Sequence, residues 1–321
     1  MLTFILRRLL LSIPVLIAAS FIIFVSVSYA ADPLAEIKMR PLSSPETIAL
    51  MTERKHLDQP VVVRYVYWVK EAITDKFGTT LDNQPVWDDL TRVIPHTLQL
   101  VLISELIALL VGALIGLYSA IRQYSVFDYA STTLSFLGFA MPVFWLALML
   151  QILFTNIFLK WDVRIFYTSG LNSADNTCTF CLDRLQHLGI PIMVLSTLQM
   201  AQYSRYMRAS MLEVVNSDYI RTARAKGLSE NRVTIRHALR NALIPIVTVS
   251  AINFGALIGG AIVTETIFQL DGMGPYFITA LGRPDVYSVM AWLVVTALLV
   301  VIFNLIADVA YGFLDPRIRY D

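Results

Sequence analysis

Ionisable side chains are scarce in the long apolar stretches of this 321-residue chain, so the few that occur there are the first candidates for chemistry. Glu105 and Glu265 both lie inside apolar runs. A charged side chain at the centre of a membrane helix costs about 2.5–3.5 kcal/mol on insertion scales, and such residues commonly face a polar pathway. We therefore treat both as candidate translocation-path residues, and pairing with a neighbouring helix remains the alternative for each.

Two cysteines, Cys178 and Cys181, lie in the stretch "CTFC". Two thiols are too few for a structural zinc site, which normally has four ligands. The loop that contains them is expected outside the membrane, where conditions are usually oxidising, and this favours a loop-closing disulfide. A metal site with His187 as a third ligand and a pair of independent thiols are the alternatives that remain open.

Enzyme motifs are missing from the sequence. It contains no phosphate-binding GxxxxGK[ST] loop, no HExxH and no GxSxG. We therefore expect no ATP hydrolysis, no bound metal and no cofactor in this chain itself. The formal net charge of +1 gives no reason to expect nucleic acid as a partner.

The elements that must position these residues are membrane helices. Hydrophobic residues make up 56% of the chain and charged residues 15%, which places it in the membrane class. Six apolar stretches are long enough to span, at about 9–31, 97–120, 129–159, 188–207, 242–267 and 288–312. The sequence thus predicts an all-α, polytopic membrane protein. The third stretch is over-long and contains Pro142, so we expect a kink or an interfacial end there, or else a hidden seventh span. The first is too long for a cleaved signal and is interpreted as an anchor.

The orientation follows from arginine and lysine in the short loops. On one side of the membrane lie the segment before span one, the loops between spans two and three and between spans four and five, and the segment after span six. These four segments contain thirteen arginine and lysine residues, whereas the short loops on the opposite side contain four. Both termini are therefore expected in the cytoplasm.

The predicted parts of the chain follow from these spans. They are an N-terminal tail with the first span (1–31), a small folded extracytoplasmic domain (32–96), a five-helix core (97–312) with a cytoplasmic loop (208–241), and a C-terminal tail (313–321).

The cytoplasmic loop carries the clearest local pattern. Ser217 and Asp218 predict a helix start, and Gly227 can adopt the left-handed conformation that ends a helix. Ser229 and Glu230 predict a second start, after which Arg232, Arg236 and Arg240 recur every fourth residue as a basic stripe. A short amphiphilic helix held at the membrane can dock in a groove of a soluble partner. The alternative is that the cations only set topology or hold anionic lipid headgroups.

The segments "DYIRTARAKGL" and "RHALRNALIPIV" resemble the cytoplasmic loop of ABC importer permeases, in particular the branch that imports oligopeptides and dipeptides. In that family the loop forms a coupling helix that docks on the ATPase subunit. The glutamate of the family's usual pattern is absent here, and Arg240 stands where many relatives have proline. By this resemblance the coupling residues are Asp218, Tyr219, Arg221, Thr222, Ala223, Arg224, Ala225, Lys226 and Gly227.

The resemblance extends over nearly the whole chain, through "FGTTL" (77–81), "RVIPHTLQL" (92–100), "AMPVFWLALML" (140–150), "VTETIFQLDGMG" (263–274) and "YGFLDPRIRY" (311–320). It implies that Asp271, Gly272, Met273 and Gly274 form part of an outer gate. It also implies a bacterial plasma (inner) membrane protein that works with a homologous second permease, two ATPase subunits that bind ATP and Mg, an extracytoplasmic binding protein, a peptide substrate and membrane lipids. A permease for nickel, haem or another small solute is the alternative within transport. A membrane sensor or scaffold with a basic lipid- or partner-binding loop is the alternative from another class.

Overall fold

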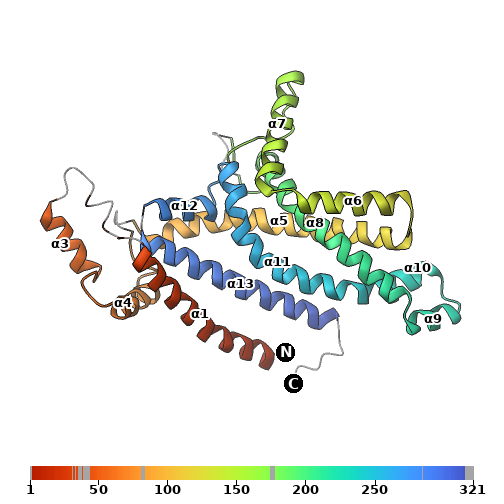
Figure 1. Ribbon diagram of the computed structural model, residues 1–321, viewed down its shortest axis with the longest axis horizontal. Coiled ribbons are helices and arrows are strands. Elements are labelled where there is room, and N and C mark those ends of the chain that lie inside the picture. Colours follow the sequence, from red (N-terminus) through yellow and green to blue (C-terminus); the bar gives the residue numbers. More distant parts are fainter. Residues whose placement is uncertain are drawn as a thin grey trace. The chain divides into compact units, whose positions relative to one another are not determined.

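The computed structural model describes residues 2–30, 32, 34, 38, 44–80, 84–173, 178–283 and 285–314 (Figure 1). These residues form helices and connecting turns and contain no named β-strand, so the all-α prediction is confirmed for them. The elements are α1 (Leu2–Ala30), α3 (Pro45–Arg54), α4 (Val61–Thr74), α5 (Val86–Ile121), α6 (Val126–Ala140), α7 (Val143–Trp161), α8 (Leu182–Val215), α9 (Asp218–Ala225), α10 (Glu230–Arg232), the π-helical segment η1 (Val233–Ala238), α11 (Leu239–Ile267), α12 (Met273–Gly282) and α13 (Val286–Leu314).

Several of these helices are long and apolar enough to cross a membrane, which makes the chain a multi-pass membrane protein. Within the described residues there are five such segments: Leu6–Tyr29, Val86–Ile121, Val143–Trp161, Glu230–Gly255 and Val286–Ile306. The predicted fourth span, 188–207, lies within α8, which has 34 residues but is not one of the five. The prediction of six spans therefore exceeds what length and composition alone support. The predicted tail (313–321) lies outside the described residues apart from 313 and 314.

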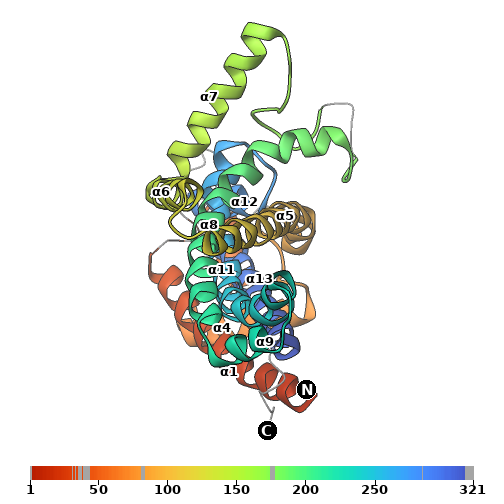
Figure 2. The same ribbon diagram turned by 90° about the vertical axis from the view of Figure 1, so that its right-hand side faces the viewer.

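The predicted third span (129–159) is two helices. α6 ends at Ala140, Met141 and Pro142 have extended backbone conformations, and α7 begins at Val143. Proline has no backbone N–H and disfavours helical conformation in the residue before it, so the break falls where the sequence predicted a kink. Figures 1 and 2 show α7 leaving the end of α6 in a new direction.

The described residues divide into two compact units, and the larger consists of those within 98–270 and 302–314. In this unit α8 packs against α6, α7 and α11. α5 approaches α8 closely because Gly112 and Gly116 have no side chains. A Cβ placed on Gly116 would lie 2.3 Å from the carbonyl oxygen of Ser204. This spacing of two glycines four residues apart is typical of tightly packed membrane helices.

The smaller unit consists of residues 2–97 and 271–301. Its core contains Phe24 of α1, Tyr65 and Trp68 of α4, and Val286 and Met290 of α13. The Ser20 hydroxyl also lies 2.8 Å from the Tyr65 hydroxyl, which ties α4 to α1. The described part of the predicted extracytoplasmic segment is thus helical, and its helix α4 packs on α1 and α13. In addition, α5 begins at Val86, well before the boundary expected from the apolar pattern.

Candidate functional site

The predicted coupling segment is a short helix with the expected ends. α9 runs from Asp218 to Ala225, Ser217 before it has an extended backbone, and Lys226 occupies the C-cap. Gly227 follows at φ +75°, the left-handed conformation that glycine adopts with least strain. The Ser217 hydroxyl, however, donates to the carbonyl oxygen of Val214 at 2.6 Å and does not cap the helix. The positions of both helix ends were predicted correctly.

α9 has one buried face and one exposed face. Ile220 is fully buried and Ala223 is 7% exposed, and both belong to a core cluster with Met207 and Met211 of α8. Of the nine predicted coupling residues, Ala223 therefore faces inward. The other eight are exposed, namely Asp218, Tyr219, Arg221, Thr222, Arg224, Ala225, Lys226 and Gly227. The exposed residues include three cations, Arg221, Arg224 and Lys226, whereas the buried ones are apolar. Figure 1 shows α9 at the end of α8.

Polar contacts fix the turn after α9. The Arg224 guanidinium donates to both carboxylate oxygens of Glu230, at 2.9 and 3.3 Å, so one ion pair bridges the Gly227 turn. Asn241 of α11 donates to the Tyr219 hydroxyl at 2.8 Å. Exposed ion pairs contribute only about 0–1 kcal/mol, so the buried apolar face supplies most of the anchoring.

The second predicted helix start is also present, but its continuation differs from an ideal α-helix. α10 begins at Glu230 after an extended Ser229, as expected. Residues 233–238 then form η1, with the wider i to i+5 hydrogen-bond pattern of a π-helix, before α11 begins. Arg232, Arg236 and Arg240 are exposed. The three cations are therefore accessible, as predicted, but they do not lie along one regular α-helix, because η1 interrupts it between Arg232 and Arg240.

The predicted outer-gate loop is held against α5. The Arg92 side chain donates to the Asp271 carboxylate, and His96 Nδ1 lies 2.6 Å from the Asp271 carbonyl oxygen. The backbone N–H of Met273 donates to the Thr97 hydroxyl at 2.8 Å. Two segments that carried the resemblance, 92–100 and 263–274, therefore meet, through residues that are 175 to 179 positions apart in the sequence.

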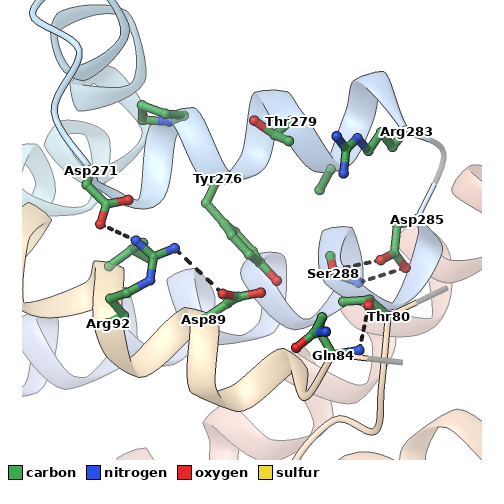
Figure 3. Close-up of a pocket in the computed structure, with 13 residues that line it drawn as sticks. Thr80, Gln84, Asp89, Arg92, Asp271, Tyr276, Thr279, Arg283, Asp285 and Ser288 are labelled. Atoms are coloured by element: carbon green, nitrogen blue, oxygen red, sulfur yellow. Dashed lines mark hydrogen bonds and ion pairs between the residues drawn. The ribbon is translucent and has the colours of Figure 1, made fainter. Parts of the chain in front are cut away.

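A cavity of about 310 Å³ lies beside this loop (Figure 3). Arg92 lies on its wall between Asp271 and Asp89, with 3.6 Å between Arg92 and Asp89. Asp285 lies at the start of α13, where its carboxylate accepts from the backbone N–H of Tyr287 and from the Ser288 hydroxyl, at 3.1 and 2.9 Å. Burial raises the pKa of Asp285. Neither Arg92 nor Asp285 stands out in the sequence. Arg92 belongs to the segment 92–100 that carried the resemblance, and this is the only sequence signal for either residue.

The two glutamates that lie in apolar runs of the sequence, Glu105 and Glu265, are buried. Glu105 of α5 is 9% exposed and accepts a hydrogen bond of 2.5 Å from the Tyr203 hydroxyl of α8. Asn253 of α11 donates to the same hydroxyl at 3.3 Å. Glu265 of α11 is 1% exposed. The contacts of Glu105 therefore agree with the helix-pairing alternative, and a translocation-path role for either glutamate remains a proposal.

A second interhelix contact was missed by sequence analysis. Asp128 of α6 is 2% exposed, and Arg208 of α8 donates to its two carboxylate oxygens at 2.6 and 2.8 Å. Ser119 also donates to Asp128. Bidentate pairs of this kind are among the stronger protein hydrogen bonds. They join the α5–α6 turn to α8, the helix that leads into α9.

The cysteine pair lies in the loop before α8. In the structure both are thiols, and Cys181 Sγ lies 3.5 Å from the carbonyl oxygen of Cys178. The disulfide remains a prediction about the oxidised protein. Within the described part of the chain, no group of three or more His, Cys, Asp or Glu side chains is arranged to hold a metal ion.

Sequence comparison decides the family. Residues 112–320 match the family described as "Binding-protein-dependent transport system inner membrane component", and residues 1–101 match the N-terminal region of such membrane components. The chain belongs to this family. The family is the membrane component of transport systems, so this chain is the permease and not the ATPase, as the missing ATPase motifs predicted.

Named relatives of this inner membrane component are peptide permeases. The chain is 40% identical to the oligopeptide transport system permease protein AppB of Bacillus subtilis (strain 168), over the full length of both. It is 38% identical to the dipeptide transport system permease protein DppB of Alkalihalophilus pseudofirmus, again over both full lengths. It is 35% identical to DppB of Escherichia coli (strain K12), over 100% of this chain and 99% of that protein.

A solved structure supports the fold. A chain of the inward-facing MetNI methionine ABC transporter matches with a TM-score of 0.56 and 15% identity, over 72% of this chain and 99% of that one. At this identity the match shows a shared permease fold.

Proposed function

We propose that this permease carries peptides into the cell as one membrane half of an ATP-driven importer. The support is the identity of 35–40% over essentially full length to permeases named for oligopeptide or dipeptide transport. The peptide is delivered by an extracytoplasmic binding protein. ATP and Mg are bound by two partner ATPase subunits, and a homologous second permease completes a heterodimer.

We infer six crossings, with α8 as the sixth. Its segment 188–207 includes Leu188, Ile190, Val194 and Tyr203, all fully buried, and α6, α7 and α11 pack around it. A helix surrounded by other helices tolerates polar residues that lipid would not, which explains why composition alone does not identify it. An even number of crossings and the arginine and lysine of the short loops support a topology with both termini in the cytoplasm, and we infer that the membrane is a bacterial plasma (inner) membrane.

The single observation that carries the mechanism is the geometry of α9. The helix is seated on α8 by Ile220 and Ala223 and exposes a polar surface with Arg221 and Lys226 to the cytoplasm. Such a surface suits docking in a cleft of an ATPase subunit. Closure of the ATPase pair would move α9, and α8 would transmit the movement through its contacts with α6 and α11.

At the other side of the membrane, the loop from Asp271 to Gly274 would act as part of the outer gate. Its contacts with Arg92, His96 and Thr97 hold it on α5 in the present state. Opening toward the binding protein would require these contacts to be exchanged. Glu105 and Glu265 remain proposed path residues whose carboxylates become available only if the helices around them separate.

Site-specific crosslinking from α9 tests this proposal. In a complex whose permease lacks Cys178 and Cys181, a cysteine at the exposed position Thr222 should crosslink to an ATPase subunit, with a yield that changes when ATP is added. A cysteine at Arg236, exposed on η1, is the matched control and should crosslink less. Equal crosslinking from both positions would contradict docking through α9. Absence of a copurifying ATPase would contradict it too and would favour the lipid-binding or scaffold alternative.

A further inference from the structure

A neutral polar cavity lies beside α7 in the larger unit. It has a volume of about 570 Å³ and is lined by Gln151, Ile152, Thr155, Asn156, Thr168, Ser169, Ile267 and Gln269. These residues come from α7, from the loop that follows it and from the end of α11 with its following turn. Binding sites for small molecules typically have volumes of about 300–1,000 Å³, so the space is sufficient for a ligand.

The polar residues of α7 gather on this cavity. Between Val143 and Lys160 the helix sequence is apolar except for Gln151, Thr155 and Asn156, and all three line the cavity. Polar side chains in a membrane helix generally face a polar space or a partner and not lipid. Apolar α7 side chains outside the cavity, such as Leu159, which is 74% exposed, can contact lipid.

The framework of the cavity is built by hydrogen bonds. Gln151 Nε2 donates to the carbonyl oxygens of Thr168 and Ile267, at 2.8 and 3.4 Å, which ties α7 to both of the other walls. The Gly170 N–H donates to the Phe268 carbonyl oxygen at 2.9 Å. Gln269 is held at φ +52°, a left-handed conformation that is uncommon for a residue other than glycine and is often found at ligand sites.

Among the residues that the structure describes, the lining consists of amide, hydroxyl and isoleucine side chains and includes no acidic or basic one. Asn156 and Gln269 are exposed, and each offers an N–H donor and a C=O acceptor, the same pair of groups as a peptide bond. Because none of the described lining residues is charged, these residues would not select among peptides by the charge of their side chains. A transporter that accepts many sequences needs contacts of this kind, since the backbone is the feature that all peptides share.

We propose that this cavity binds the backbone of the transported peptide through Asn156, Gln269 and the neighbouring hydroxyls. The proposal rests on the proposed function and adds to it a binding site for the peptide backbone. It predicts contact that is neutral and independent of peptide sequence.

Photocrosslinking in the complete complex tests the proposal. The complex is reconstituted in proteoliposomes with its binding protein and ATP, and benzoylphenylalanine replaces Thr155. Radiolabelled tri-alanine, Ala-Lys-Ala and Ala-Glu-Ala are the probes, and crosslinking is normalised to uptake. We expect all three peptides to crosslink with yields that agree within about twofold. Benzoylphenylalanine at Leu159, on the same helix but outside the cavity, should give no peptide adduct. Ser169 is a second cavity position if the substitution at Thr155 impairs assembly.

The variant Asn156→Leu, which has nearly the same shape without the amide, should lower the crosslinking yield by about two- to twelvefold, the effect of one lost hydrogen bond. Gln123→Met, in an exposed loop outside the cavity, is the control and should change nothing. Equal peptide adducts from positions 155 and 159, a strong preference for one charged peptide, or adducts with another permease chain in place of the peptide would overturn the inference. If the unsubstituted complex imports no peptide, the proposed function fails first and this inference fails with it.

Discussion

Replacement of Gly227 by valine tests the turn that directs the chain after α9. Gly227 has φ +75°, and a Cβ built on it meets no atom within 4 Å. The substitution therefore creates no clash, and its cost is the backbone penalty alone. For a residue with a Cβ in the left-handed region this penalty is about 1–2 kcal/mol, and a β-branched residue lies at the upper end. This energy reduces the population of the native turn about 5- to 30-fold relative to alternative conformations.

The rest of α9 should resist the change. Ile220 is fully buried, and burial of such a side chain contributes about 1.5–3 kcal/mol, so the helix should stay on α8. The exposed pair between Arg224 and Glu230 contributes at most about 1 kcal/mol and cannot hold the turn by itself. We therefore expect Gly227→Val to leave insertion and assembly near normal while misdirecting the docking surface.

The assay measures peptide uptake and transport-linked ATP hydrolysis in membranes that contain the whole complex. Both should fall together in Gly227→Val, whereas Gly227→Asn should keep most activity because asparagine tolerates the left-handed region. Gly282→Val is a matched control, since a Cβ there also meets nothing within 4 Å and the backbone is not left-handed. Normal uptake by Gly227→Val, or equal losses in Gly227→Val and Gly282→Val, would refute the reasoning.

Three further outcomes follow from single contacts. Gly116→Leu must force α5 away from α8, because a Cβ at this position would already lie 2.3 Å from a backbone oxygen of α8. The thermal unfolding midpoint of the purified complex should therefore fall by several degrees. An unchanged midpoint would contradict the close packing. Arg92→Gln and Asp271→Asn each remove an ion pair whose side chains are 53% and 49% exposed, so protein levels should be unchanged. Peptide uptake should change by the same amount in each single variant and in the double variant, because all three lack the same contact. Additive effects on uptake would show that the two residues act separately. Thiol reagents should label Cys178 and Cys181 in native membranes only after reduction, and labelling without reductant would disprove the disulfide.

Local rules predicted the ends of the short helices but not their partners. The extended Ser217 and left-handed Gly227 follow from the preferences of single residues, and the break at Pro142 follows from a missing N–H. These features depend on a few neighbouring residues and can be predicted from them. The π-helical segment η1 was not predicted, because its residues, VTIRHA, carry no local signal for the wider i to i+5 hydrogen-bond pattern.

Contacts between distant segments could not be derived from pattern alone. Arg92 and Asp271 are 179 positions apart in the sequence, and the residues around each of them do not identify the other as its partner. The spacing of Gly112 and Gly116 indicates a close helix contact, but only the structure identifies α8 as the partner. The cavity beside α7 is a similar case. Its polar residues stand out within an apolar helix, but the loop and the α11 end that complete it are found only in the fold.

The most direct test of the central claim is peptide uptake by the reconstituted complex. Proteoliposomes contain this permease, its partner permease and the two ATPase subunits, and binding protein loaded with radiolabelled tripeptide is supplied on the extracytoplasmic side. We predict peptide translocation across the bilayer that requires ATP, Mg and the binding protein, together with ATP hydrolysis that the loaded binding protein stimulates. ATP hydrolysis that peptide-loaded binding protein does not stimulate, with no peptide crossing the membrane, would contradict the account.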